Sequence, residues 1–489
     1  RSERVPLAAH LRDDEAAARF HMLEQLADHD DALLEQLLID EAPQLDTIFG
    51  DLARETAAGL IAPVLFGSAQ NGFGIGRLLK MLRHDTPLAA TTAQRLGIEG
   101  ATAEIFKISH GCAVGRLAFA RVFGAPLAEG AELVGCDGAR TRAGSLFALQ
   151  GSQTIKIARA APGDMIGIAK IDTAQAGDRF GTTGRAPVAA QTTERPVTNC
   201  ALAIAAKDHK DDVRLSTALN RLIEEDPALH WGTDEATRET LLHGLNDEHL
   251  NVVLARLKRR YGVAVSSSPP AVAYKESIRK TVTQHGRHKK QSGGHGQFGD
   301  VIIEVRPLAR GEGFRFEDKI TGGAIPRQWI PAVEQGVRDA MASGPMGFPV
   351  VDVAVALTDG SFHSVDSSEL AFRTAGRIAM AEALAAAAPY LLEPIAQVIV
   401  HAPGNAVSRI TSAATSRRGQ MLGIEPLDGW SRWDRIALTL PEAELHGLET
   451  ELRSLSQGMA HYEARFDHLA EVNGKVASGI VQQRVPEPA

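Results

Sequence analysis

The chain has 489 residues, of which 44% are hydrophobic and 23% charged, and its formal net charge is −8 at pH 7. These values are typical of soluble globular proteins, and the length predicts about three to five domains. No run of about 18 uncharged apolar residues occurs, which excludes a membrane-spanning helix. The cysteines, Cys112, Cys136 and Cys200, lie far apart without CxxC spacing, which excludes a disulfide framework or a zinc site and favours a reducing compartment.

The first segment, residues 1–95, is predicted to be mainly helical. Apolar residues recur at helical spacing between Asp14 and Leu38. A short apolar run then predicts a strand, a loop and a further helix, at residues 60–66, 67–72 and 75–82. Because the chain starts with Arg1 rather than Met and no signal-like segment follows, we expect a processed or truncated start.

The next segment, residues 96–190, changes to short apolar or alternating runs separated by Gly, Asp and Pro turns. Many short strands with regular turns predict a small β-barrel. A polar, Pro-containing linker follows it. The expected strands are residues 101–108, 115–122, 133–134, 145–149, 154–158 and 165–168.

Two later segments, residues 197–267 and 392–472, share the predicted element order βαββαβ. This is the order of a ferredoxin-like split βαβ fold. The elements expected in the first are residues 200–205, 213–223, 228–231, 239–243, 247–261 and 263–265. Those expected in the second are residues 396–401, 405–417, 420–425, 435–440, 442–456 and 461–466.

Between these two segments, residues 270–391 are predicted to form an elongated α/β domain. The order strand, helix, strand indicates a βαβ crossover. The tail, residues 473–489, has little apolar content at its end and is expected to be flexible. The whole chain is therefore predicted to be an α+β multidomain protein. The expected elements of the α/β domain are residues 300–306, 314–319, 326–342, 350–357 and 369–388.

A short basic segment stands out in this acidic chain. Residues 275–296 contain six Lys or Arg and one acid, Glu276, so their charge is 6 − 1 = +5. Within it, residues 287–298 read Arg-His-Lys-Lys-Gln-Ser-Gly-Gly-His-Gly-Gln-Phe. A local cationic segment with glycines favours a phosphate-rich partner, nucleic acid first. The alternative is a solvated basic loop, since basic runs are common and weak as motifs.

Searches for catalytic and nucleotide motifs give no site. No GxxxxGK[ST], HExxH or GxSxG occurs, and Gly474-Lys475 lacks the rest of a P-loop. The glycines at 72, 74 and 76 suggest a tight turn before a helix rather than a dinucleotide fingerprint. Acid–histidine pairs such as Asp467-His468 are interpreted as surface or capping groups, since no partnering nucleophile is present. We predict no catalytic residue and no metal site.

Two polar segments remain as candidate contacts. His363 lies in a loop before a helix, where Asp366 and Glu369 could act as a capping box and leave His363 free to project. Arg417 and Arg418 end another helix before Gly419. They could complement the helix C-terminus, with Gly419 as the cap, or clamp a phosphate.

Several segments, taken in chain order, resemble bacterial elongation factor G. They include Lys289-Lys-Gln-Ser-Gly-Gly-His-Gly-Gln-Phe298, Gly322-Gly-Ala-Ile-Pro326, Val365-Asp-Ser-Ser-Glu-Leu-Ala-Phe372 and Ser416-Arg-Arg-Gly-Gln420. The resemblance covers nearly the whole chain. It implies a translational GTPase of five domains, with a G domain, a β-barrel, two ferredoxin-like domains and an elongated domain with tip loops. Such a protein would be cytoplasmic and monomeric, with no membrane partner.

The resemblance also assigns the nucleotide site. Gly67, Ser68 and Ala69 would be the last guanine-contacting motif, and residues 1–95 the C-terminal remnant of the GTPase domain. The other GTP and Mg²⁺ motifs would lie upstream of Arg1. We therefore expect neither GTP nor Mg²⁺ to bind this chain, although the full-length family uses both.

The implied partners are the ribosomal RNA of both subunits and the transfer RNA–messenger RNA complex. The elongated domain would enter the decoding centre during GTP-dependent translocation, and glycines, lysines and amides suit contacts with RNA phosphates and 2′-OH groups. Arg417 and Arg418 would contact large-subunit RNA. The residues implied at the tip are Lys289, Lys290, Gln291, Gly293, Gly294, His295, Gln297 and His363.

Departures from the family pattern keep other functions open. The chain has Asn246-Asp-Glu-His249 where the family has Gly-Glu-Leu-His, and Ser364 replaces a common Asp. These departures suggest a divergent paralogue. The alternatives are a factor for ribosome recycling or ribosome protection, or an RNA-binding module that works without GTP.

Overall fold

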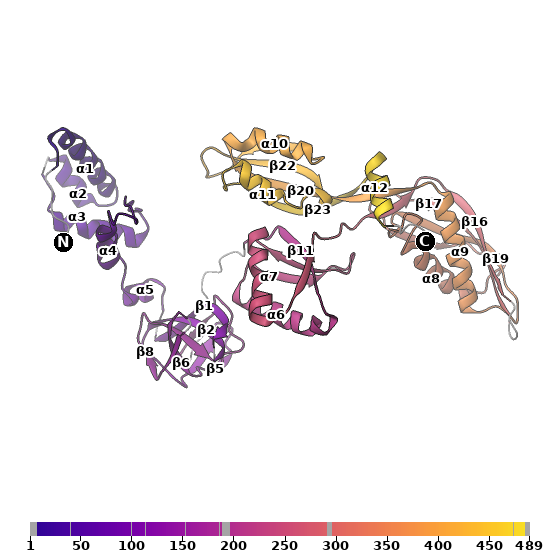
Figure 1. Ribbon diagram of the computed structural model, residues 1–489, viewed down its shortest axis with the longest axis horizontal. Helices are drawn as coiled ribbons and strands as arrows, with labels where there is room; N and C mark the ends of the chain where they lie inside the picture. The colour runs from indigo at the N-terminus through magenta and orange to yellow at the C-terminus, as the bar shows by residue number, and fades with distance from the viewer. Residues whose placement is uncertain are drawn as a thin grey trace. The chain divides into compact units, whose positions relative to one another are not determined.

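The computed structural model describes residues 7–484, except 40, 99, 113, 152, 185, 188–195, 291–295 and 473. The chain divides into two compact units, residues 1–193 and 194–489, and each is described by itself. Figure 1 shows the helices and sheets within each unit. Within the described ranges, no helix is long and apolar enough to cross a membrane.

The N-terminal segment is helical, as predicted, but its first long stretch forms two helices. The Asp30 carboxylate accepts hydrogen bonds from the backbone N–H groups of Ala32 and Leu33, at 3.0 and 3.1 Å, and so begins a new helix. Leu26 and Leu33 pack into the small core that joins the helices. The helices are α1 (Arg12–Ala27), α2 (Asp31–Leu38), α3 (Leu45–Ala58), α4 (Ile75–His84) and α5 (Ala89–Arg95).

The strand predicted at residues 60–66 is wrong. This segment is irregular, and Val64 and Phe66 are 76% and 91% exposed. A strand needs a neighbour for its backbone hydrogen bonds. The described residues offer this segment no pairing strand beyond the single bridge between Ser68 and Phe73 that follows it.

The segment predicted to form a small β-barrel contains a curled antiparallel sheet. Its strand order is β5-β4-β10-β1-β2-β9-β6-β7. Leu133 of β4 and Leu146 of β6, which lie far apart in this order, share one core, so the sheet must curl. The strands are β1 (Ala101–Cys112), β2 (Gly115–Gly124), β4 (Glu132–Gly135), β5 (Arg140–Arg142), β6 (Leu146–Gln150), β7 (Gln153–Ile157), β9 (Met165–Ala169) and β10 (Arg179–Gly181), beside the separate pair β3 (Leu127–Ala128) and β8 (Arg159–Ala160).

The first ferredoxin-like prediction is confirmed in order and topology. The sheet order β12-β13-β11-β14 is fully antiparallel and places the first strand between the third and fourth. Leucines of both helices pack with Ile204 and Leu242 of the sheet. The elements are β11 (Cys200–Ala206), α6 (Asp212–Glu225), β12 (His230–Thr233), β13 (Thr240–Gly244), α7 (Asp247–Tyr261) and β14 (Val265–Ser268).

The second ferredoxin-like prediction is also confirmed. Strand β22 lies between β21 and β20, and β23 pairs with the other edge of β20. The first residues of the long β20 also pair with β15 (Lys275–Ile278). The elements are β20 (Pro389–Pro403), α10 (Val407–Ser416), β21 (Gln420–Pro426), β22 (Trp433–Pro441), α11 (Leu448–Leu455) and β23 (His461–Glu471).

The elongated α/β region contains the predicted crossover. Strands β18 and β19 are parallel and joined through helix α8, while the other pairs in the sheet β16-β17-β19-β18 are antiparallel. Helix α9 lies along β16 and β17 (Figure 1). The elements are β16 (Val282–Lys290), β17 (Gln297–Pro307), β18 (Phe314–Asp318), α8 (Ile330–Met341), β19 (Val353–Ser361) and α9 (Glu369–Ala386).

Two glycines let the β16–β17 pair lie directly on α9. A Cβ at Gly286 would come within 2.5 Å of the Ala375 carbonyl oxygen, and one at Gly299 within 2.5 Å of the Ala371 carbonyl oxygen. These contacts are too short for any side chain, so the backbone of the strand pair rests on the helix. The basic segment, for which no strand was predicted, is thereby part of a rigid sheet up to Lys290.

The tail predicted to be flexible contains a packed helix, α12 (Gly474–Arg484). Ala477, Ile480 and Val481 pack against buried Phe348 and Leu391. The expectation of flexibility was therefore wrong for residues 474–484. It rested on the polar end of the tail and overlooked these apolar residues.

Candidate nucleic-acid interface

Strand β16 carries the basic residues toward one end of its sheet. Lys289 and Lys290 pair in register with Phe298 and Gln297 of β17. Both lysines are exposed, and among the described residues neither has a recorded side-chain partner. Their two charges are therefore available to a partner in solution.

Asp300, on strand β17, pairs with Arg287, the cation that precedes the two lysines on strand β16. Its carboxylate lies 3.5 Å from Nε of Arg287 and 2.7 Å from Nε2 of His285. The Arg287 guanidinium also lies over the Phe298 ring, 5.5 Å from the centroid. The free positive charge is thus concentrated at Lys289 and Lys290, whereas Arg287 serves local packing.

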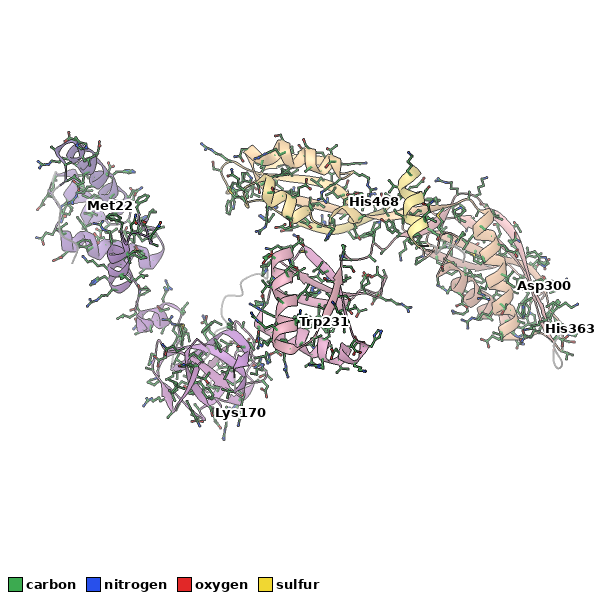
Figure 2. All side chains as sticks on the ribbon, viewed as in Figure 1. Met22, Lys170, Trp231, Asp300, His363 and His468 are labelled. Atoms are coloured by element: carbon green, nitrogen blue, oxygen red, sulfur yellow. The ribbon has the colours of Figure 1, made fainter. Side chains whose placement is uncertain are left out.

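His363 lies at the same end of this sheet as Asp300, where Figure 2 labels both residues. It lies outside the helix cap, as expected, but one nitrogen of its ring is engaged within the loop. Nδ1 accepts a hydrogen bond from the backbone N–H of Asp366 at 3.2 Å, and the ring faces Phe298 with centroids 6.4 Å apart. The side chain remains 55% exposed.

The predicted capping box before α9 is wrong. Ser368 caps the helix by accepting a hydrogen bond from the backbone N–H of Ala371 at 3.3 Å. The Asp366 carboxylate instead accepts a bond from the backbone N–H of Gly296 at 3.1 Å. The loop of residues 362–367 is therefore attached to the start of β17.

The side chain of Gln297, another predicted contact, is engaged within the β16–β17 pair. The Gln297 side-chain oxygen lies 2.9 Å from Nε2 of His288, so part of its bonding capacity is used within the strand pair. Gln291, Gly293, Gly294 and His295 lie outside the described residues.

Arg417 and Arg418 are held in ion pairs within their own domain. Arg417 donates from Nε to Glu451 at 2.7 Å and also to the His446 carbonyl. Arg418 forms a two-point ion pair with buried Glu393, at 2.7 and 3.0 Å, and a further bond to Glu444. The hydrogen bond with Glu393 raises the pKa of Arg418. This pairing favours a structural role over the phosphate clamp.

The predicted glycine cap after α10 is wrong. The residue in the left-handed conformation is Arg418, with φ of 61°, and not Gly419. Gly419 donates its N–H to the Ala414 carbonyl at 2.8 Å. A Cβ at this position would come within 2.7 Å of that oxygen, so glycine is needed for close approach rather than for backbone freedom.

Gly67, Ser68 and Ala69 form part of a tight turn. Ser68 donates its N–H to the Phe73 carbonyl at 3.0 Å, and a Cβ at Gly67 would come within 2.7 Å of the same oxygen. In the described ranges no group of three or more His, Cys, Asp or Glu side chains could hold a metal ion.

Comparison with known proteins agrees with this division of the molecule. Four family models match: elongation factor G domain 2 over residues 100–183, domain III over 195–269, domain IV over 270–388, and the elongation factor G C-terminus over 390–480. An elongation factor G-like protein of Synechocystis is 42% identical, covering 97% of this chain and 71% of that protein. The chain belongs to the elongation factor G family.

Two further matches agree with this assignment. The elongation factor G of Fervidobacterium nodosum is 36% identical, covering 98% of this chain and 71% of that protein. The crystal structure of a Thermus thermophilus protein matches with a TM-score of 0.80 at 32% identity, covering 99% of this chain and 72% of that chain. Lys289, Lys290 and His363 fall in the match to domain IV, and Arg417 and Arg418 in the match to the C-terminus.

Asp366 and Asp300 are the residues of this interface that sequence reasoning missed. Asp366 was assigned to a helix cap because it stands three residues before Glu369. Its partner Gly296 lies 70 positions away, and no local pattern links the two. Asp300 lies across a strand pair that was not predicted, so its proximity to Arg287 had no signal.

Proposed function

We propose that this elongation factor G family protein binds the ribosome through the exposed end of its domain IV region and promotes translocation of transfer RNA with messenger RNA. The observation that carries the proposal is the pair Lys289 and Lys290, which are exposed and unpaired among the described residues, on a rigid strand beside His363. Lysine ammonium groups suit RNA phosphates, and an imidazole N–H suits a phosphate or a 2′-OH. On the ribosome, such a factor would act in the cytoplasm.

The test is ribosome binding by the 489-residue chain as salt is varied. Lys289→Ala with Lys290→Ala should weaken binding and flatten the plot of log affinity against log salt by roughly 1.4–1.8, since each phosphate contact contributes about 0.7–0.9. Lys207→Ala with Lys210→Ala is a matched control, because both lysines are exposed and lie in the domain III match. An unchanged salt slope in the first variant would argue against phosphate contact.

The position of binding separates translocation from the alternatives. A photocrosslinker attached at Lys289→Cys should react with RNA of the small subunit close to the codon–anticodon duplex. Crosslinks confined to large-subunit RNA would favour a different factor function. Toeprinting of the messenger RNA would then measure movement directly, beside an assay of subunit splitting for recycling.

We also propose that Gly67, Ser68 and Ala69 contact the guanine of GTP in the complete nucleotide site of the family. The tight turn supports this, as does the exposed apolar surface beside it at Phe66 and Phe73. The relatives are longer than this chain, which covers 71% of the Synechocystis protein. We expect the chain alone to show no GTP hydrolysis above a buffer control.

A further inference from the structure

Asp366 connects the loop of residues 362–367 to the start of strand β17 through both its side chain and its backbone. Its carboxylate accepts the N–H of Gly296 at 3.1 Å and lies 3.3 Å from Nδ1 of His363. Its backbone carbonyl accepts the N–H of Phe298 at 2.8 Å. One residue therefore touches both segments that the proposed function uses.

The neighbouring Ser367 strengthens the same connection. Its hydroxyl donates to the Phe298 carbonyl at 3.0 Å and accepts the backbone N–H of His363 at 2.9 Å. A parallel bridge joins Phe298 and Ser367. The loop of residues 362–367 is thus bonded to the start of β17 through both side chains and backbone.

Gly296 is shaped to receive the Asp366 carboxylate. A Cβ at residue 296 would come within 2.8 Å of the Asp366 Cγ, and within 3.0 Å of each carboxylate oxygen. A side chain at residue 296 would therefore force the Asp366 carboxylate to move. The absence of a side chain at 296 is therefore matched to the presence of the carboxylate at 366.

We propose that Asp366 is a positioning residue, which holds His363 and the lysine-bearing strand pair as one rigid RNA-facing surface. The proposal rests on the proposed function, because it assumes that Lys289, Lys290 and His363 bind one RNA partner together. An acid beside two lysines lowers the local positive charge, so on charge alone its removal would strengthen RNA binding. As a positioning residue, its removal weakens binding. The charge effect and the positioning role therefore predict opposite changes in RNA affinity when Asp366 is replaced.

Three substitutions in the 489-residue chain test the sign. Asp366→Ala removes both charge and acceptor, and should weaken ribosome binding roughly three- to tenfold. Asp366→Asn removes the charge but keeps an oxygen for the Gly296 N–H, and should stay within about twofold of the parent chain. The matched control is Asp359→Ala, which removes an exposed acid whose carboxylate accepts the backbone N–H of the next residue, Gly360, at 2.8 Å. Binding of this control should be unchanged or slightly stronger.

The partner residue gives a second arm. Gly296→Ala places a methyl group against the Asp366 carboxylate and should weaken binding as Asp366→Ala does. The double variant should be no weaker than either single one, because both changes break the same connection. Additive losses would overturn the proposal.

Hydrogen exchange separates a failure of this inference from a failure of the proposed function. In the free protein, Asp366→Ala should speed exchange of the Gly296 amide about tenfold, with Asp366→Asn and Asp359→Ala near the parent rate. Unchanged exchange, or stronger ribosome binding by Asp366→Ala, overturns the positioning role alone. Absence of ribosome binding by the parent chain overturns the proposed function, and the RNA-facing part of this inference with it.

Discussion

Two basic pairs in this chain look alike in sequence and differ in structure. Lys289 and Lys290 have no recorded partner among the described residues, whereas Arg417 and Arg418 are bound to Glu451 and Glu393. The difference lies in the carboxylates that the fold brings beside them. A basic pair is evidence of a phosphate site only when the tertiary structure leaves its charge unpaired.

The strongest test of this comparison is Arg418→Ala. The substitution leaves the buried Glu393 carboxylate, only 5% exposed, without its two-point partner. We expect a loss of roughly 2–3 kcal/mol in the free energy of unfolding, measured by urea denaturation, because an unpaired buried charge is costly. Arg409→Ala, on the preceding helix α10, is the control, since Arg409 is exposed, and should cost less than about 0.5 kcal/mol. A drop in RNA affinity without loss of stability would instead assign Arg418 to the interface.

Another carboxylate of the same unit, Glu276, is buried, and no cation pairs with it among the described residues. Its burial predicts that the stability of the protein depends on pH. Glu276 is 1% exposed and accepts hydrogen bonds from the backbone N–H groups of Met346 and Phe348, at 2.9 and 2.7 Å. Burial raises the pKa of this carboxyl above its ordinary value of 4.5.

Because the folded state favours the protonated Glu276 carboxyl, protonation of this group stabilises the fold. This contribution is complete below pH 4.5 and is lost as pH rises through the folded pKa. Glu276→Gln removes the titration, so its free energy of unfolding should fall less over that range than that of the parent chain. The effect should be smaller than that of Arg418→Ala, since both backbone donors keep an acceptor. Parallel pH profiles for the two proteins would contradict the assignment.

Regular elements with periodic apolar residues could be predicted from the sequence, and the local chemistry of the interface could not. Helix α7 was predicted at its observed bounds, Asp247–Tyr261, because its apolar residues recur at helical spacing and Asn246 precedes it. The crossover through α8 followed from element order alone. The strand at residues 60–66 failed because an apolar run does not show whether a pairing strand exists.

The errors at the interface share one physical cause. Asp366, Asp300 and Glu393 act on partners brought near by tertiary packing, and such pairs leave no periodic signal in the sequence. Strand β16 was also missed, because its basic and polar residues hide the alternation that a half-buried strand shows. The family resemblance named the lysines and His363, and the structure identified the acids that decide which cations stay free.

The smallest effect is expected from releasing a cation that is now neutralised. Asp300→Asn removes the negative charge 3.5 Å from Nε of Arg287, while an oxygen remains for His285. If charge pairing decides which basic residues bind RNA, this variant should bind ribosomes about two- to fourfold more tightly, with a salt slope steeper by roughly 0.7–0.9 for one added phosphate contact. Glu312→Gln removes an exposed acid from the loop between β17 and β18 and should leave both quantities unchanged. Equal gains in the two variants would mean that net charge, rather than the pairing of Arg287, controls binding.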